Sequence, residues 1–283
     1  MPMHWQTARF RIDLAQPRVM GIVNITPDSF SDGGRFHSTS AALAHCERLL
    51  ADGADILDLG AESSRPGSPP VSLDEELARL LPVLRGAVGL GVPVSVDTSK
   101  PEAMRACLDA GADIVNDIWA LRQPGAREAV AAHRGCGVCL MHMHGEPRTM
   151  QQAPMEGDAV AQVRAFLADQ VQALRALGVA AERIVVDPGI GFGKTVAQNF
   201  ALLARQGELL RIGPALLAGW SRKSSLGHVT GMDVGDRMVP SVAAALIAVE
   251  RGARIVRVHD VRETVAAFQV WRAALDETTK DIA

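Results

Sequence analysis

The chain has 283 residues, and its 48% hydrophobic and 22% charged content excludes disordered and fibrous proteins. A formal net charge of −3 offers no basic surface for nucleic acid. The longest apolar runs, such as Ser241–Val249, are far shorter than the roughly 20 residues that span a bilayer. The first residues also lack the apolar segment of a signal peptide. We therefore expect a cytoplasmic protein without nucleic-acid or membrane partners.

Four cysteines are too few for a disulfide scaffold in a chain of this length. Cys136 and Cys139 have the spacing of a zinc-binding pair, and His142 and His144 follow closely. The segment, however, has the composition of a strand, in which residues three apart point to opposite faces. Because the ligands of one metal ion must converge, we do not expect a zinc site here.

Eight short runs rich in β-branched and aliphatic residues alternate with longer amphipathic segments. Strands that alternate with helices are typical of parallel βαβ units. The pattern predicts an α/β fold, a single-domain (β/α)8 TIM barrel over residues 18–283, with residues 1–17 as an N-terminal extension packed on the barrel. The predicted strands are Val19–Ile25, Ile56–Leu59, Val92–Asp97, Ile114–Ile118, Val138–Met143, Ile184–Asp187, Ala215–Ala218 and Ile255–Val258.

Three predicted helices begin with a capping box, in which a Ser or Thr and a Glu or Gln three residues later satisfy each other's free backbone amides. The boxes start at Ser72, Ser99 and Thr195. Pro101 fits the first turn of its helix, where a backbone N–H has no partner to lose.

Three helices are expected to end on a glycine that is followed, five residues later, by a polar residue within a strand. Equal depth on three strands of one barrel would direct these polar side chains to a shared end. Alternatively, the similarity arises only because helix-to-strand loops look alike in any α/β protein. The polar residues are Asp58 after Gly53, Asn116 after Gly111 and Arg257 after Gly252.

The carboxyl ends of the predicted strands carry many polar residues, and this is the end at which (β/α)8 barrels build active sites. One such residue is usually a helix cap or a loop brace. The whole set combines both charge signs with amides, which favours a common site. Its members are Asn24, Asp97, Asn116, Asp117, Asp187, Ser221, Arg222, Lys223, Arg257, His259 and Asp260.

Two connections, Thr26–Ser38 and Ala61–Ser72, are long and rich in Gly, Pro and Ser. We expect them to be mobile functional loops rather than tolerated surface insertions. A third segment, Gly189–Thr195, resembles a Walker A loop, but Pro188 stands where that motif needs its first glycine. Lys194 likewise replaces the third glycine of a dinucleotide-binding motif, so both nucleotide interpretations are rejected.

Longer motifs run through nearly the whole chain, from about Met20 to about Thr264. They are Met20–Gly34 (MGIVNITPDSFSDGG), Asp58–Gly67 (DLGAESSRPG), Ser95–Lys100 (SVDTSK), Asn116-Asp117, His142-Met143, Asp187–Lys194 (DPGIGFGK), Ser221–Ser224 (SRKS) and Arg257–Asp260 (RVHD). In this order they resemble the dihydropteroate synthase family of pterin-binding enzymes. Departures are small: Ser64 stands where the family commonly has threonine, and Ala61 replaces a usual glycine.

The resemblance implies a transferase of folate biosynthesis. Such an enzyme condenses 6-hydroxymethyl-7,8-dihydropterin diphosphate with p-aminobenzoate, giving 7,8-dihydropteroate and pyrophosphate. The expected mechanism is ionisation to a pterin methylene cation, which the amine then attacks. The resemblance also implies Mg²⁺ as cofactor with Asn24 as its ligand, a homodimer, and inhibition by sulfonamides, which mimic p-aminobenzoate.

Roles for single residues follow from the same resemblance. Asp187 and Asn116 would bind the edge of the pterin ring, and Lys223 would donate to ring O4 or N5. Asp97 would lie near the N5/N8 side and face the developing cation. The diphosphate would be bound by Ser64, Arg65, Arg257 and His259, of which the last three, with Asp97 and Lys223, form the expected catalytic set.

The pocket for p-aminobenzoate is expected to have Phe30 and Pro66 among its walls. Further substrate contacts are expected from Ser221, Val258, Phe192 and Met141. Two alternatives remain open. A methyltetrahydrofolate-dependent methyltransferase would share the pterin-binding residues but would not need the diphosphate-binding ones, and a pterin-binding paralogue would lack synthase activity.

Overall fold

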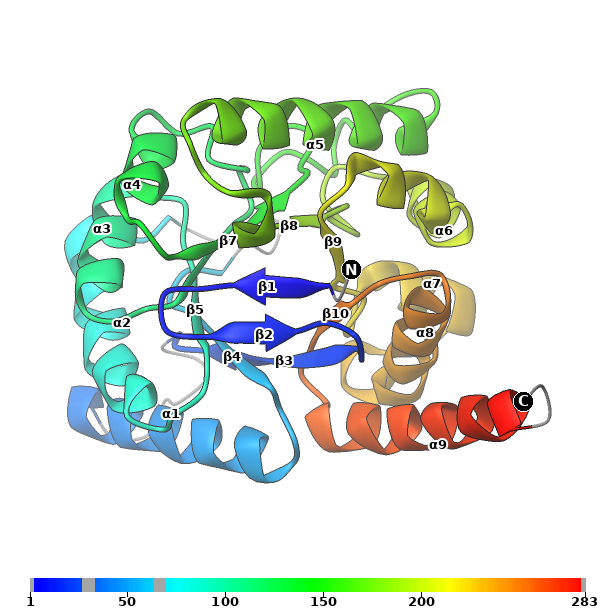
Figure 1. Ribbon diagram of the computed structural model, residues 1–283, viewed down its shortest axis with the longest axis horizontal. Coiled ribbons are helices and arrows are strands. Elements are labelled where there is room, and N and C mark those ends of the chain that lie inside the picture. Colours follow the sequence, from blue (N-terminus) through cyan, green and yellow to red (C-terminus); the bar gives the residue numbers. More distant parts are fainter. Residues whose placement is uncertain (1–2, 27–33, 64–69, 281–283) are drawn as a thin grey trace.

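The computed structural model describes residues 3–26, 34–63 and 70–280, and its centre is a closed barrel of parallel strands (Figure 1). The strands follow one another around the barrel in the order β10-β3-β4-β5-β6-β7-β8-β9, so neighbours in sequence are neighbours in space. The predicted (β/α)8 fold is confirmed. The barrel strands are β3 (Arg18–Asn24), β4 (Ile56–Gly60), β5 (Val94–Asp97), β6 (Ile114–Asp117), β7 (Gly137–Met141), β8 (Ile184–Asp187), β9 (Ala215–Ala218) and β10 (Ile255–Val258).

Helices surround the barrel and connect its strands (Figure 1). They are α1 (Gly34–Ala51), α2 (Leu73–Val88), α3 (Pro101–Asp109), α4 (Ala126–Ala132), α5 (Ala159–Ala176), α6 (Val196–Ala204), α7 (Ser224–Thr230), α8 (Met238–Glu250) and α9 (Val261–Lys280). Short 3₁₀ helices occupy η2 (Ala181–Arg183), η3 (Gln206–Ile212) and η4 (Val234–Asp236).

The predicted helix starts are confirmed at two of three positions. Thr195 caps α6 with a complete capping box, and the Ser72 hydroxyl accepts from the backbone amide of Glu75 at the start of α2. The box predicted at Ser99 is wrong. Because Pro101 is the first residue of α3, the N-cap position falls on Lys100, which makes no side-chain cap bond.

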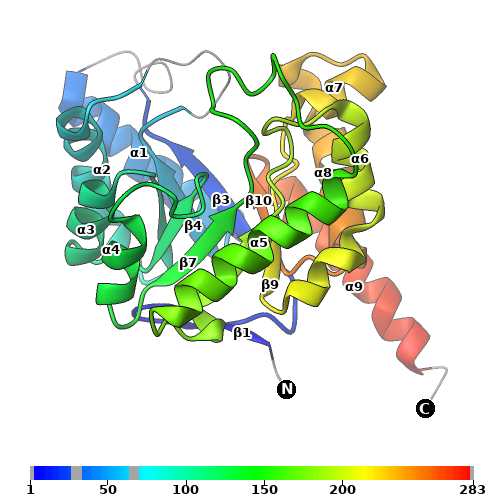
Figure 2. The same cartoon turned by 90° about the horizontal axis from the view of Figure 1, so that it is seen from above.

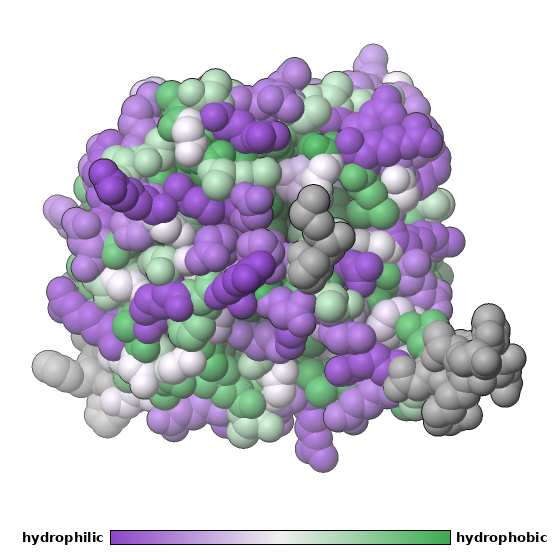
Figure 3. Space-filling model, viewed as in Figure 1, coloured by the Kyte–Doolittle hydropathy of each residue, from purple (hydrophilic) through white to green (hydrophobic). Residues whose placement is uncertain are grey.

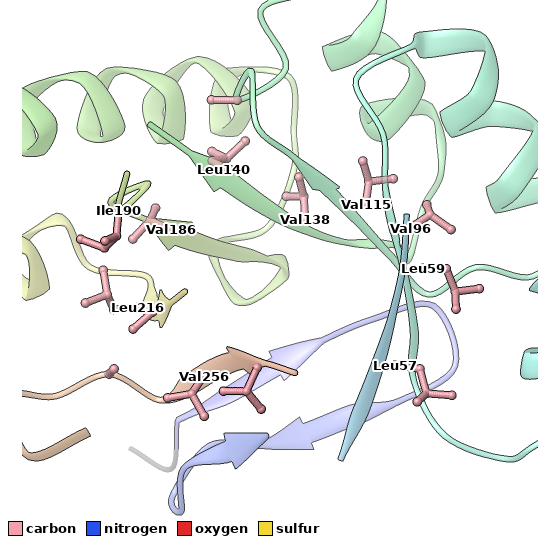
Figure 4. Close-up of a cluster of buried hydrophobic side chains, with 14 of the residues drawn as sticks. Leu57, Leu59, Val96, Val115, Val138, Leu140, Val186, Ile190, Leu216 and Val256 are labelled. Carbon is pink, nitrogen blue, oxygen red and sulfur yellow. The ribbon is translucent and has the colours of Figure 1, made fainter. Parts of the chain in front are cut away.

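The barrel strands alternate in which side chains face the helices and which face the barrel axis. Leu57, Val115 and Val256 belong to the outer apolar layer between strands and helices (Figure 4). Their neighbours Ile56, Ile114 and Ile255 belong instead to a separate cluster inside the barrel. The residues after the outer set, namely Asp58, Asn116 and Arg257, therefore return to the inside, nearer the carboxyl ends of the strands.

A hairpin of β1 (His4–Gln6) and β2 (Arg11–Asp13) closes the amino-terminal end of the barrel. Trp5 and Ile12 pack into the inner cluster, and the Trp5 indole nitrogen donates to the Arg183 carbonyl at 3.0 Å. Arg11 and Asp13 are exposed. In the view of Figure 1, where the hairpin lies in front, hydrophilic and apolar residues are interspersed over the surface (Figure 3). The hairpin lies at the bottom of Figure 2 and α7, which follows β9, at the top, so the barrel opens at the carboxyl ends of its strands.

The expected glycine positions are confirmed, because Gly53, Gly111 and Gly252 have φ angles of 99°, 102° and 96°, which favour a residue without a Cβ atom. The divergence of the CxxC thiols is also confirmed: Cys136 packs in the outer layer and Cys139 in the inner cluster. Within the described part of the chain, no helix has both the length and the apolar character needed to cross a membrane.

Candidate active site

The polar interior near the barrel mouth is organised around the fully buried carboxylate of Asp58 on β4. The Arg257 Nε on β10 donates to Asp58 Oδ2 at 2.6 Å, and the Asn116 amide nitrogen on β6 donates to the same oxygen at 3.3 Å. Arg257 Nη2 also donates to Asp97 Oδ2 on β5 at 2.9 Å. We call Asp58, Asp97, Asn116 and Arg257 the Asp58 cluster. It confirms that the three polar residues spaced after glycines meet at one depth.

Asp97 is the member of this cluster whose protonation is most affected by its surroundings. Burial raises the pKa of its carboxyl from 3.8 to about 7, against the opposing charge of Arg257 and with help from the carboxylate of Asp58. Its side chain is 17% exposed, so it faces the mouth while its partner Asp58 lies completely beneath the surface. A carboxyl in this position can change protonation state near neutral pH.

Asp187, the last residue of β8, is buried at the same end of the barrel. One oxygen, Oδ1, accepts from the backbone amide of Gly189 at 2.7 Å. Burial raises the pKa of this carboxyl, and the Gly189 bond and the charge of Lys223 oppose that change. The other oxygen, Oδ2, lies 3.7 Å from the place where a Cβ atom of Gly219 would be. Because that position is a glycine, no side chain from it covers the carboxylate.

The segment after β8, residues 188–195, is held in place by the side chain of Lys194, which is only 2% exposed. Its Nζ donates to the Gly189 and Phe192 carbonyls at 2.8 and 3.0 Å. Burial lowers the pKa of this ammonium to about 7, and the Asp187 carboxylate opposes that change. Gly189 must be a glycine, since a Cβ there would lie 1.8 Å from the His142 carbonyl oxygen. This packing sets the position of Phe192 relative to Asp187.

An apolar wall beside Asp187 consists of Met141, Met143, Met150 and Phe192, all of them buried. The Lys223 ammonium lies 4.3 Å from the centre of the Phe192 ring. Lys223 is the residue that precedes α7, so the connection after β9 brings it next to the segment after β8. The mouth therefore combines an apolar cluster with a cation and a buried carboxylate.

Ser221 and His259 join the connections after β9 and β10. The Ser221 hydroxyl lies 2.9 Å from His259 Nδ1, and it accepts from the His259 backbone amide at 3.1 Å. Val258 differs from the other expected site residues, because its side chain packs in the outer apolar layer. The expected contact of Val258 with substrate stays a prediction.

A cavity of about 210 Å³ lies beside Asp97, and Glu62, Glu76, Ser99, Trp119 and Arg148 are among its lining residues. The fully buried Glu76 carboxylate pairs with Lys100 Nζ at 2.6 Å, and Lys100 also pairs with Glu62. The end of β4 is thereby fastened to α2 and to the segment after β5.

Comparisons with known proteins show the family to which the chain belongs. A family model described as pterin binding enzyme matches residues 20–259. The dihydropteroate synthase of Escherichia coli K12 is 48% identical over 265 residues, covering 93% of this chain and 94% of its own. The chain belongs to the dihydropteroate synthase family.

Two solved dihydropteroate synthases share the fold over nearly the whole length. The Burkholderia cenocepacia enzyme, complexed with 7,8-dihydropteroate, has a TM-score of 0.90 at 52% identity and 99% coverage of both chains. The Xanthomonas albilineans enzyme with 4-aminobenzoic acid has a TM-score of 0.92 at 48% identity, covering 97% of this chain and 99% of its own.

Several expected dihydropteroate synthase residues cannot be placed. Phe30, Ser64, Arg65 and Pro66 lie outside the described residues, as do residues 27–33 and 64–69 of the two long predicted loops. The first predicted loop was too long, because α1 begins at Gly34 rather than after Ser38. Asn24, at the end of β3, is half-buried and pairs in register with Gly60, which precedes the second of these loops.

Two important residues were not assigned as site residues from the sequence. Asp58 could have been, because it occupies an inward position on β4 and is a carboxylate within an otherwise apolar strand. Lys194 could not, since only the folded chain shows that its ammonium reaches the carbonyls of its own loop.

We predict that Asp97→Asn changes how stability depends on pH. A carboxyl with a pKa of about 7 in the fold and 3.8 as its ordinary value is protonated in the fold but ionised in the unfolded chain between these limits. Unfolding then releases a proton, so the stability that Asp97 contributes is lost as pH rises from about 4 to about 7. Asp97→Asn should lose less stability across this range.

The measurement is urea unfolding of both proteins from pH 4.5 to 8. This range covers most of the ~pH 4–7 window of the linkage and extends just above it. Asp236→Asn, at an exposed position of η4, is the matched control and should follow the wild type. Parallel stability curves for Asp97→Asn and wild type would contradict the raised pKa.

Proposed function

We propose that this dihydropteroate synthase condenses 6-hydroxymethyl-7,8-dihydropterin diphosphate with p-aminobenzoate. The observation that carries the proposal is the composition of the barrel mouth. A buried carboxylate, Asp187, lies beside an apolar wall and within the influence of the charges of Lys223 and Arg257, while His259 is joined to Ser221 after β9. A flat ring with polar edges and an anionic leaving group needs all three kinds of surface.

Asp187 and Asn116 would bind the pterin edge. The carboxylate is suited to accept from the ring N–H and the 2-amino group, and the amide offers both a donor and an acceptor. Met141 and Phe192 would cover one part of the ring's apolar surface. Lys223, whose ammonium already lies over Phe192, would donate to ring O4 or N5.

The diphosphate would be bound by Arg257 and His259, together with Ser64 and Arg65. In the reaction, the bond between the pterin methylene carbon and the diphosphate oxygen breaks, and its electron pair leaves with that oxygen. The amine nitrogen of p-aminobenzoate then donates its lone pair to the methylene carbon and loses a proton. Electrostatic stabilisation by the cations and by Asp97 would lower the barrier, and no protein nucleophile is needed.

Asn24 would be the protein ligand of Mg²⁺, which would neutralise charge on the leaving diphosphate. An amide oxygen is the hard ligand that this ion accepts, and Mg²⁺ usually takes few protein ligands besides waters and substrate phosphates. The proposal is supported by the place of Asn24 at the carboxyl end of β3, in register with Gly60 at the end of β4.

The p-aminobenzoate pocket would be completed by Phe30 and Pro66 next to Ser221 and Lys223. Sulfonamides mimic this substrate and would therefore compete with it. We also propose that the enzyme acts in the cytoplasm, in folate biosynthesis, where both small substrates would be available.

We predict pyrophosphate release only when both substrates and Mg²⁺ are present, with sulfonamide inhibition that p-aminobenzoate overcomes. Asp187→Asn keeps the shape of the side chain but replaces one acceptor by a donor, and loss of a charged hydrogen bond costs about 1.5–3 kcal/mol. Calorimetric pterin affinity should therefore fall by roughly tenfold or more.

Asp169→Asn on the outer helix α5 is the matched control and should bind normally. A folded wild type that binds pterin but releases no pyrophosphate would identify a paralogue without synthase activity. Near-normal pterin affinity in Asp187→Asn would show that another group anchors the ring.

We propose a homodimer formed through the α7–α8 face, defined by Val229, Met232, Val234, Val239 and Ile247. These side chains are 36% to 64% exposed, although they are apolar. Apolar side chains that gather on neighbouring elements favour burial against a partner. A symmetric pair of identical faces is the commonest way in which soluble chains achieve this.

Light scattering should give about twice the chain mass of 30.1 kDa for the wild type. Val239→Glu should shift the protein towards the monomer, because it places a charge in the proposed interface. Leu177→Glu is the control: this residue is 47% exposed but follows α5, at the top of Figure 1, whereas α8 lies at the right. A monomeric wild type, or a dimer that resists Val239→Glu, would contradict the proposed face.

A further inference from the structure

The connection after β9 contains a residue in an unusual backbone conformation. Arg222 has a φ of 58°, in the left-handed region that residues with a Cβ atom rarely adopt. It lies between Ser221, which bonds His259, and Lys223, which precedes α7. A strained residue at such a place persists only where its surroundings hold it.

Three parts of Arg222 are held by hydrogen bonds. Its guanidinium forms a two-point ion pair with Asp260, with Nη2–Oδ1 at 2.6 Å and Nε–Oδ2 at 3.2 Å. Its backbone amide donates to the Ser241 hydroxyl of α8 at 2.9 Å, and its carbonyl accepts from Arg237 Nη1 at 3.3 Å. The backbone and the side chain are therefore fixed from different elements.

Asp260 is itself well anchored, which makes it a suitable support. It lies between β10 and α9, and its side chain is 13% exposed. Its carbonyl accepts from both the backbone amide and the hydroxyl of Thr264, at 3.1 and 2.7 Å. A bidentate bond from a planar guanidinium to such a fixed carboxylate also restricts the orientation of the arginine.

The conformation of Arg222 sets the direction of the next residue. Lys223 returns to extended backbone, with φ −63° and ψ 147°, and its side chain crosses the segment after β8. Its Cδ lies 3.3 Å from the place where a Cβ of Gly191 would be, and its ammonium lies over Phe192. A right-handed conformation at Arg222 would turn the following peptide and move Lys223 away from this position.

We propose that Asp260 is a positioning residue for Lys223, which it directs into the mouth by holding Arg222 in the left-handed conformation. In this role Asp260 acts through Arg222 and not by a contact of its own with the substrate. Because Lys223 contacts the pterin in the function proposed above, the inference rests on that function. It adds that two links join the connections that carry Lys223 and His259. One is the Ser221–His259 bond, and the other is the Arg222–Asp260 ion pair, which orients the Lys223 side chain.

The first test exploits the freedom of glycine at positive φ. Arg222→Ala and Arg222→Gly both remove the ion pair, but only the alanine keeps the Cβ atom that disfavours the left-handed conformation. We expect Arg222→Ala to weaken binding of a phosphate-free hydroxymethylpterin at least tenfold in calorimetry. Arg222→Gly should bind several-fold more tightly than Arg222→Ala. Equal losses in the two variants would overturn the proposal.

The second test asks whether Asp260 acts through Lys223. Asp260→Ala should weaken pterin binding at least tenfold in the wild type but should have no further effect in a Lys223→Ala background. Glu208→Ala is the matched control, since it removes a carboxylate that pairs with Arg205 on the outside of the barrel, at 2.8 Å. Equal effects of Asp260→Ala in both backgrounds, or none in the wild type, would overturn the proposal.

These readouts separate the inference from the proposed function. Pterin binding is measured without turnover, so a wild type that releases no pyrophosphate would disprove the function and leave the binding tests readable. If Asp260→Ala failed to fold, as judged by its thermal unfolding, the comparison of Arg222→Gly with Arg222→Ala would still test whether the left-handed conformation at residue 222 positions Lys223.

Discussion

The site depends on one buried carboxylate, that of Asp58, and on the cation that neutralises it. Asp58 has no exposed surface, and an unpaired charge at such a place would be strongly destabilising. Arg257 supplies the opposite charge at 2.6 Å and extends to Asp97, while Asn116 donates to the same Asp58 oxygen. Four strands of the barrel are thereby joined at one level. Above this level the interior is polar, and below it the apolar cluster closed by Trp5 excludes water.

This arrangement explains how Arg257 and Asp97, which carry opposite charges, can both lie at the barrel mouth in fixed positions. Arg257 is already oriented before any substrate arrives, so its remaining donor capacity can be directed at a leaving anion without further ordering. Asp97 faces the mouth with a pKa raised to about 7 by burial. Around this centre, Lys194 fixes the position of the segment that carries Phe192, and the Arg222–Asp260 pair fixes the direction of the Lys223 side chain. Lys223 and Phe192 are thus held by residues, Asp260 through Arg222 and Lys194, to which no ligand contact is assigned.

Much of this could be predicted from the sequence, because strand periodicity is a local property. The spacing from each glycine to Asp58, Asn116 and Arg257 placed them at one depth, and the closed barrel brings them together. The hairpin of β1 and β2 was not predicted as strands, since runs of three residues carry no clear alternation.

Other features depend on the folded chain and could not be read from local patterns. The capping box at Ser99 failed because Pro101 occupies the first helical position and moves the cap to Lys100. The left-handed backbone of Arg222 has no signal in its residue type, which disfavours that conformation. It is held by partners far along the chain, namely Asp260 on the side chain and Ser241 and Arg237 on the backbone.

The most direct test of the account is a double-mutant cycle of Asp58→Asn and Arg257→Met, read by calorimetric binding of a phosphate-free hydroxymethylpterin. If the buried pair organises the site, each single change should weaken binding. The double variant should then lose less than the sum of the two losses, with a coupling of about 0.5–3 kcal/mol, because it removes both charges of the Asp58–Arg257 pair together. Strictly additive losses, or normal binding in Asp58→Asn, would show that the site does not depend on this ion pair.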